Sequence, residues 1–187
     1  MSQKKILRRK YYNLRKKKYY EVEQGFFSPL IRLIKSNFKK KNFNLALYYP
    51  SSFELNVLKL LENDYMKNKN VFLPVIEKKN SMNFYLWKKN KALTVNKFGI
   101  LEPAKDSIKT PNLMLIPILA FDRYKYRLGY GKGFYDRYLN RYLSKFKNII
   151  TVGVAFSFQE HHKLPINKKD VKLRYILTEK GILQWKY

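Results

Sequence analysis

A glycine-rich segment between Arg127 and Arg137 carries the clearest chemistry in the sequence. It reads RLGYGKGFYDR, so that a glycine stands at every second position from 129 to 133. Alternate glycines let a backbone approach an anion closely, and a helix that begins after them offers unpaired N–H groups and a partial positive charge. Arg127 and Lys132 add formal charge to the same place. The segment therefore predicts a phosphate-binding loop.

Two common phosphate motifs do not match this loop. The glycine spacing differs from the dinucleotide-binding G-x-G-x-x-G, and Lys132 is followed by Gly133, not by the Ser or Thr of a P-loop. The alternative interpretation is a glycine-rich turn that needs positive φ angles, with Arg127 and Arg137 in solvent. The spacing alone leaves both interpretations open.

A longer stretch around the loop resembles a known family. The sequence NLMLIPILAFD (112–122), three further residues and then YRLGYGKGFYDRYL (126–139) is similar to the signature of the 5-formyltetrahydrofolate cyclo-ligases. The resemblance implies that Arg127 and Lys132 are catalytic and that Asp136 holds magnesium. It implies ATP binding by Arg127, Leu128, Gly129, Tyr130, Gly131, Lys132, Gly133, Phe134 and Tyr135. It also implies that Tyr130, Gly131, Lys132, Gly133 and Phe134 touch the folate substrate.

The first helix offers a second set of cations. The same family has a Lys-x-x-x-Arg near its start that reaches the nucleotide, which implies ATP binding by Lys4, Lys5, Ile6, Leu7, Arg8 and Arg15. At about 100° per residue, Lys4, Arg8 and Arg15 fall within an arc of about 40°, beside an apolar stripe. Chance alignment is the alternative, because nine of the first 18 residues are Lys or Arg.

Glu54 is the candidate that would bind the folate, together with Tyr49. The resemblance matches Glu54 to a folate-binding glutamate, and a carboxylate can accept paired hydrogen bonds from a pterin ring. However, Ser51 and Glu54 also have the S-x-x-E spacing of a capping box, so Glu54 could instead cap its own helix.

Near the end of the chain, Asp170 matches a second magnesium contact of the family. Two carboxylates from separate elements suit a magnesium ion that takes its other ligands from water and phosphate. The family pattern has a further aspartate four residues on, where this chain has Arg174.

The reaction that the resemblance implies is a phosphoryl transfer followed by ring closure. The formyl oxygen of 5-formyltetrahydrofolate attacks the γ-phosphate of ATP, and N10 then attacks the activated carbon. The products are 5,10-methenyltetrahydrofolate, ADP and phosphate. Such a transfer needs positioning and charge neutralisation from the protein, and no side-chain nucleophile is evident.

The elements that must position these residues alternate between helix and strand patterns. This alternation predicts an α/β fold, an α/β/α sandwich around a mostly parallel sheet, in one domain over residues 1–187. Helices are predicted over 4–20, 28–40, 53–65 and 134–146, and strands over 44–49, 71–76, 83–87, 112–121, 149–156 and 174–178.

Composition narrows the chemistry further. The chain has no cysteine, so disulfides, zinc–thiolate sites and cysteine nucleophiles are excluded, and metal binding must rest on carboxylates. No apolar run is long enough for a signal peptide or a membrane span. We therefore expect a cytoplasmic protein, a monomer, without a membrane partner.

The formal charge of +27 is the most unusual feature of the composition. It would suit a basic RNA-binding protein, with tyrosines that stack on bases, and this is the rival from another class. The lysines are spread over the whole chain together with many Asn, Ile, Tyr and Phe, which is also typical of compositional drift. Nucleic-acid binding leaves the glycine loop unexplained, so we do not expect it. A family member that binds folate without turnover is the third possibility.

Overall fold

A seven-stranded mixed sheet forms the centre of the protein. The computed structural model describes residues 2–38, 42–78, 81–146 and 148–183. The strand order is β11-β10-β9-β6-β1-β2-β3, in which all neighbours are parallel except β11 and β3 at the two edges. This confirms the predicted α/β fold with a mostly parallel sheet. The bounds are Leu45–Ala46 (β1), Val71–Ile76 (β2), Met82–Trp87 (β3), Leu113–Pro117 (β6), Ile150–Val154 (β9), Tyr175–Thr178 (β10) and Gly181–Leu183 (β11).

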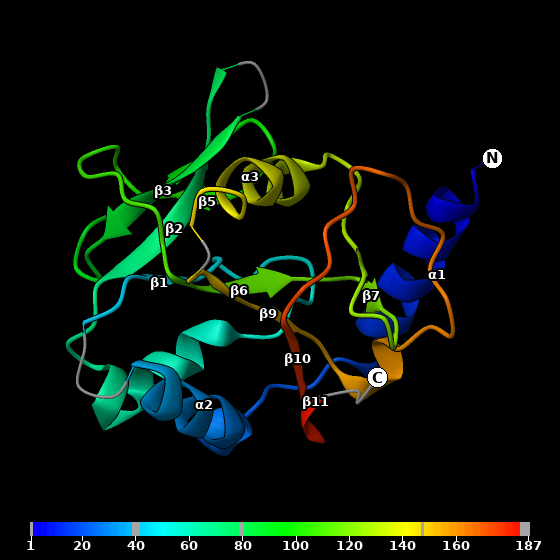
Figure 1. Ribbon diagram of the computed structural model, residues 1–187, viewed down its shortest axis with the longest axis horizontal. Helices are drawn as coiled ribbons and strands as arrows, with labels where there is room; N and C mark the ends of the chain where they lie inside the picture. Colours follow the sequence, from blue (N-terminus) through cyan, green and yellow to red (C-terminus); the bar gives the residue numbers. More distant parts are fainter. Residues whose placement is uncertain (1, 39–41, 79–80, 147, 184–187) are drawn as a thin grey trace.

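Helices cover both faces of this sheet (Figure 1). On one face lie α2 (Ser28–Phe38) and the 3-10 helices η2 (Val57–Glu62) and η3 (Asp64–Met66), and on the other lies α3 (Phe134–Tyr142). Side chains alternate across a strand, so β6 supplies both layers. Leu113 and Leu115 belong to the core on the α2 side, whereas Met114 and Ile116 belong to the core on the α3 side.

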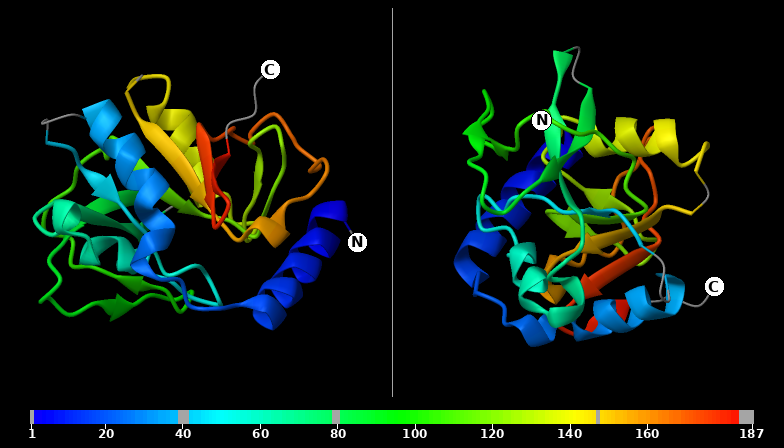
Figure 2. Two further views of the ribbon diagram at one scale, coloured as in Figure 1. Left: turned by 90° about the horizontal axis from the view of Figure 1, so that it is seen from below. Right: turned by 90° about the vertical axis from the view of Figure 1, so that its left-hand side faces the viewer.

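The helix α1 (Gln3–Lys18) lies beside the sheet, not over either face (Figures 1 and 2). Leu7 and Tyr11 are buried against a small hairpin formed by β7 (Ala120–Phe121) and β8 (Arg127–Leu128). Asp122, which is 1% exposed, accepts hydrogen bonds from the backbone N–H groups of residues 124, 126 and 164. This buried carboxylate fixes the hairpin against which α1 packs.

The structure corrects three of the predicted elements. No α-helix runs over 53–65: Ser52 and Phe53 have positive φ, so the chain makes a tight turn and continues as η2 and η3. The predicted strand over 112–121 is broken after Pro117, because the chain turns there into the β7–β8 hairpin. The strand expected over 44–49 shortens to Leu45–Ala46. The end of the helix predicted over 28–40 lies outside the described residues.

Pro74 lies inside β2. It pairs with Phe84 of β3, while β1 on the other side pairs only with Val71 and Phe72. Beyond Phe72 the β1 side of β2 has no strand partner among the described residues. A proline, which has no N–H to donate, is therefore tolerated there.

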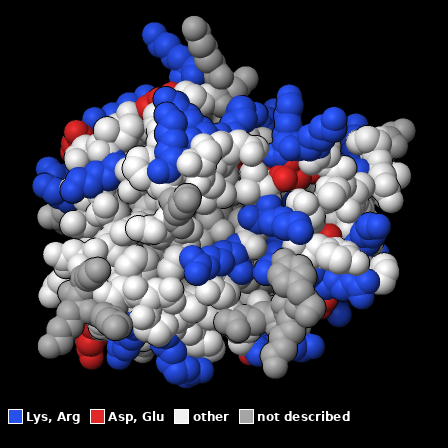
Figure 3. All heavy atoms as spheres, in the orientation of Figure 1, with Lys and Arg blue, Asp and Glu red and all other residues white. Residues whose placement is uncertain are grey.

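Two features considered in the sequence, the basic composition and the length of apolar segments, can be compared with the structure. Figure 3 shows lysine and arginine side chains distributed over most of one face, with neutral surface between them. Within the described residues no helix is both long and apolar enough to cross a membrane. Four further short elements lie within the described residues: the hairpin strands β4 (Thr94–Val95) and β5 (Leu101–Glu102), and the 3-10 helices η1 (Gln24–Phe27) and η5 (Ser157–Gln159).

Candidate active site

A cavity of about 910 Å³ lies at the carboxyl ends of the central parallel strands. Pro117 at the end of β6 and Tyr48 and Tyr49 just after β1 line it, as expected for a ligand site in an open α/β sheet. The predicted site residues that line this cavity are Lys4, Arg8, Tyr49, Glu54, Arg127, Leu128, Gly129, Tyr130, Gly131, Lys132, Gly133, Phe134, Tyr135, Asp136 and Asp170.

The glycine loop forms one wall of the cavity. It connects β8 to α3, so it directly follows a short hairpin strand. Gly131 and Gly133 have φ angles of 99° and 68°, which are accessible to glycine at little cost. A Cβ at Gly131 would lie 3.0 Å from the Arg8 guanidinium carbon. Glycine suits position 131 for two reasons: the backbone there has a positive φ angle, and the Arg8 guanidinium occupies the space beside it.

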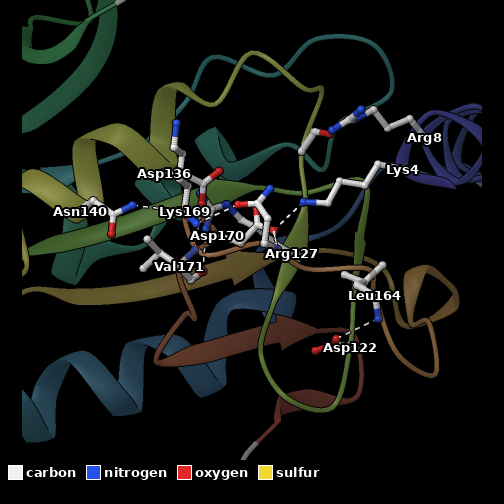
Figure 4. Close-up of polar contacts among 12 residues, drawn as sticks. Lys4, Arg8, Asp122, Arg127, Asp136, Asn140, Leu164, Lys169, Asp170 and Val171 are labelled. Atoms are coloured by element: carbon white, nitrogen blue, oxygen red, sulfur yellow. Dashed lines mark hydrogen bonds and ion pairs between the residues drawn. The ribbon is translucent and has the colours of Figure 1, made fainter. Parts of the chain in front are cut away.

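A buried ion pair fixes the start of α3. Arg127 Nη2 donates to Asp136 Oδ1 at 2.6 Å, and the same oxygen accepts from the Val171 N–H at 3.2 Å (Figure 4). Arg127 Nη1 donates to the Val171 carbonyl at 3.1 Å. Burial lowers the pKa of Arg127, and the carboxylate of Asp136 opposes this shift. The Arg127 side chain is only 3% exposed, so this pair belongs to the folded framework as well as to the cavity wall.

A second ion pair connects α1 to the segment before β10. Lys4 Nζ lies 2.5 Å from Asp170 Oδ2, which also accepts from the Asn167 N–H at 2.7 Å (Figure 4). One turn along α1, Arg8 Nε donates to the Gly129 carbonyl at 2.8 Å. Lys132 is exposed, and its ammonium lies 5.6 Å from the Phe98 ring centroid. Cations from α1 and from the loop thus face the same cavity.

Among the described residues of α1, only Lys4 and Arg8 line the cavity. Lys5 and Ile6 are exposed, and Leu7 is buried against the β7–β8 hairpin. The structure does not bring these three side chains to the ligand space. It confirms instead the helical arc of Lys4, Arg8 and Arg15, because each of the three bonds to a residue that lines the cavity, namely Asp170, Gly129 and Tyr130.

Arg15 is a buried support for the loop and not part of the cavity lining. It is 1% exposed, donates to the Ser52 carbonyl at 2.7 Å and to the Ile118 carbonyl at 3.3 Å, and also donates to the Tyr130 hydroxyl. Arg15 therefore does not line the ligand space of the described structure, and ATP binding by Arg15 stays a prediction from the resemblance. Its physical role is to hold Tyr130 and the turn at Ser52 in place.

Glu54 lies in a tight turn at the other end of the cavity. Its Oε2 accepts from the Ser51 N–H at 3.0 Å and the Ser51 hydroxyl at 3.3 Å, but no helix begins there. The contact between Ser51 and Glu54 that the capping interpretation predicted is present, but Glu54 does not cap a helix. Burial raises the pKa of Glu54, while Arg15 and hydrogen bonds from Ser51 and Tyr130 oppose the shift. A 7% exposed carboxylate in a ligand cavity can accept from a ligand's N–H groups.

The β4–β5 hairpin forms an apolar wall that sequence reasoning missed. Phe98 packs against Phe134 with ring centroids 5.8 Å apart, and Ile100 and Met82 also line the cavity. Glu102 Oε1 accepts from the Ile76 N–H at 2.7 Å and from Asn96 Nδ2 at 2.6 Å, which ties the hairpin to the end of β2. The G-I-L-E-P run at 99–103 was the only signal available for this wall.

The carboxylates of the cavity can be compared with the ligands that a magnesium ion requires. Within the described residues no group of three or more His, Cys, Asp or Glu could enclose a metal ion. Asp136 and Asp170 both line the cavity beside the glycine loop, and each binds its protein donors through one oxygen. Two carboxylates fit an ion that keeps several waters and takes phosphate oxygens from a nucleotide. The donor set thus fits magnesium as a partner of ATP and does not fit a closed metal cage.

Fold and site together define an α/β enzyme with a glycine-rich loop and an adjoining apolar wall in one cavity. The model of the 5-formyltetrahydrofolate cyclo-ligase family matches residues 1–179. A 5-formyltetrahydrofolate cyclo-ligase of Haemophilus influenzae is 32% identical over 173 residues, which cover 89% of this chain and 90% of that protein. The chain belongs to the 5-formyltetrahydrofolate cyclo-ligase family, whose members are ATP-dependent ligases.

Solved structures agree with this assignment. The NMR structure of an Aquifex aeolicus 5,10-methenyltetrahydrofolate synthetase matches with a TM-score of 0.72 and 30% identity, over 97% of this chain and 92% of that one. A 5,10-methenyltetrahydrofolate synthetase from Mycoplasma pneumoniae matches with a TM-score of 0.69 at 22% identity, over 95% of this chain and 99% of that one. The second likeness supports the fold alone.

Proposed function

We propose that this chain converts 5-formyltetrahydrofolate and ATP to 5,10-methenyltetrahydrofolate, ADP and phosphate. The observation that carries the proposal is a single cavity with two kinds of wall. One wall has a glycine loop, cations and two carboxylates, which suit a nucleotide phosphate with its metal. The other has a buried glutamate and apolar side chains, which suit a heterocycle with N–H donors.

The phosphates of ATP belong in this scheme beside the glycine loop. Arg8 of α1 and Lys132 of the loop supply positive charge, and the N-terminus of α3 supplies backbone N–H groups. Lys4 is paired with Asp170 in the free protein, and it would become available to a phosphate if that aspartate held a metal. The bound magnesium would neutralise charge on the transferring phosphoryl group. Asp136 and Asp170 are the residues that would hold it.

The folate ring belongs against Glu54 and the apolar wall. Tyr49, Met82 and Phe98 offer apolar contact, while the Glu54 carboxylate accepts N–H donors of the pterin. This arrangement brings the formyl group to the loop side of the cavity, where its oxygen can attack the γ-phosphate of ATP. N10 of the folate then attacks the activated carbon and phosphate departs. The protein contributes position and charge, and Arg127 and Lys132 are the cations proposed to stabilise the transfer.

The proposal is tested by following the near-ultraviolet absorbance of the methenyl product. Purified protein is mixed with 5-formyltetrahydrofolate, magnesium and ATP, with ATP omitted in a parallel reaction and magnesium chelated in a third. Absorbance should grow only in the complete mixture. A flat trace from folded protein would instead favour folate binding without turnover. Cytoplasmic location, a monomeric state, a single domain and the lack of a nucleic-acid partner stay predictions from the sequence.

A further inference from the structure

Tyr135 carries a hydroxyl that the free protein leaves unused. Among the residues that the structure describes, only three buried side-chain nitrogen or oxygen atoms lack a hydrogen-bond partner, and Tyr135 Oη is one of them. Buried hydroxyls are normally satisfied, because burial without a partner costs free energy. A phenylalanine would fill the same space without that cost. The hydroxyl therefore indicates a partner that arrives with a ligand.

The location of Tyr135 limits which part of a ligand its hydroxyl could contact. Tyr135 lies in the first turn of α3, lines the cavity and packs its ring near Phe84, with centroids 6.3 Å apart. Its pKa is raised by burial and by the charge of Glu54, and lowered by Arg127, so both side chains act on the hydroxyl. Glu54 stands at the proposed folate end and Arg127 at the proposed phosphate end. Tyr135 lines the same cavity as both residues and is influenced by the charge of both, which supports a position between the two proposed subsites.

Two neighbouring tyrosines of the cavity, Tyr48 and Tyr130, do not share this property. The Tyr48 hydroxyl donates to the Leu55 carbonyl at 2.8 Å, and the Tyr130 hydroxyl accepts from Arg15. Both are already tied to protein groups and support the cavity wall. Among these three cavity tyrosines, Tyr135 alone has a hydroxyl that is buried and without a partner in the described structure.

We propose that Tyr135 is a catalytic residue that donates a hydrogen bond to the oxygen joining the activated carbon to phosphorus. This inference rests on the proposed function. When N10 attacks, the N10–C bond forms and the C–O bond breaks with its electron pair on the phosphate oxygen. The departing phosphate takes up the proton that N10 loses. The hydroxyl keeps its own proton throughout and stabilises the negative charge that develops on the leaving oxygen.

The test compares two tyrosines of the same helix. Tyr135→Phe removes only the unpaired hydroxyl. The matched control is Tyr138→Phe, because Tyr138 is 4% exposed, lies outside the cavity lining and has its hydroxyl bonded to the side chain of Thr110. Tyr135→Phe should lower kcat roughly 100-fold, the size expected for one donor to a developing oxyanion, without lowering the melting temperature. Tyr138→Phe should lower the melting temperature and leave kcat unchanged.

A single-turnover experiment locates the step. With Tyr135→Phe and excess enzyme, ADP should form at the rate of the unmodified protein while methenyl absorbance lags behind it. KM for ATP should change less than about threefold, since ground-state binding is not the role proposed. Normal kcat, an effect confined to KM for ATP, or equal slowing of ADP and product would overturn the inference. If the unmodified protein itself forms no product, the proposed function fails and this inference fails with it.

Discussion

The two ends of the cavity differ in the partners that their charged side chains have in the free protein. At the cationic end, which comprises Lys4, Arg8, Arg127 and Lys132 with Asp136 and Asp170, opposite charges are already paired at 2.6 Å and 2.5 Å. At the glutamate end, the Glu54 carboxylate is held by the N–H and hydroxyl of Ser51, which are neutral donors. The first end thus holds its two carboxylates in direct ion pairs and keeps an excess of positive charge, whereas the carboxylate of the second end is bonded by neutral donors and feels the charge of Arg15 in addition.

This difference indicates how each end would respond to its ligand. An ion pair can exchange its partners when a metal nucleotide binds, because the incoming metal and phosphate carry the same signs as the groups they replace. A buried carboxylate with neutral donors gains stabilisation when a ligand brings additional N–H groups. The cationic end should therefore be sensitive to loss of charge, and the glutamate end to loss of an acceptor.

The strongest test of the cationic end is Asp136→Asn. Turnover should fall at least about 100-fold, because both the metal contact and the charge beside Arg127 are lost. The asparagine oxygen can still accept from Arg127 and Val171, so the stability cost should be limited to about 1–3 kcal/mol. Initial rates at rising magnesium and thermal melting measure the two effects. Asp106→Asn, at an exposed position outside the cavity lining, is the matched control. Wild-type turnover at ordinary magnesium would remove Asp136 from the site.

At the glutamate end, Glu54→Gln should raise KM for the folate by roughly 30-fold, since a buried charged acceptor is replaced by a neutral amide. KM for ATP should stay within a factor of about two, because the two subsites are separate. Steady-state kinetics with each substrate varied in turn separate these effects. An equal change in both KM values would contradict the division of the cavity into two ends.

Although Glu54→Gln should weaken folate binding, it should make the folded protein more stable relative to the unmodified protein as pH rises. Because burial raises the pKa of Glu54 above its usual 4.5, the folded state binds this proton more tightly than the unfolded chain does. That stabilisation is complete below the unfolded pKa and is lost as pH rises through the raised folded value. Glu54→Gln should therefore gain melting temperature relative to the unmodified protein as pH rises from acid to neutral. A constant difference across that range would show that Glu54 titrates normally.

Lys132→Ala should have a smaller effect. Lys132 is exposed, so solvent screens its charge, and its loss should raise KM for ATP about fivefold with no change in melting temperature. The effect should shrink at high salt. Lys163→Ala is the control, because Lys163 is also exposed but lies outside the cavity lining. A fall in stability without a change in KM would mean that Lys132 serves the loop and not the phosphate.

Sequence reasoning located the elements with long and regular patterns. The helices beginning at Gln3, Ser28 and Phe134 and the strands β2, β9 and β10 all lie where hydrophobic periodicity placed them, within a few residues. The glycine loop was found because its residue types carry their own physical reason. These signals are local, so a single sequence is enough to find them.

The missed features depend on contacts between distant segments. The strands β4 and β5 have two residues each, and the role of Glu102 depends on the Ile76 N–H in another strand. Burial of Arg15 depends on carbonyl groups at Ser52 and Ile118. At Glu54, the positive φ of Phe53 overrode a capping pattern that was correct in spacing. Periodicity contains no information about such partners.

The smallest effect should come from Arg174→Asp, which restores the aspartate of the family pattern. Arg174 is exposed, its guanidinium lies 5.7 Å from the Tyr175 ring centroid, and its side chain does not line the cavity. Its backbone N–H bonds to Thr151 Oγ1 at 2.9 Å, a contact that any residue can keep. We therefore expect kcat and the magnesium dependence of Arg174→Asp to match those of the unmodified protein. A marked gain in magnesium affinity would instead mean that the segment 170–174 turns into the cavity when the metal nucleotide binds, and that the cationic end is not complete in the free protein.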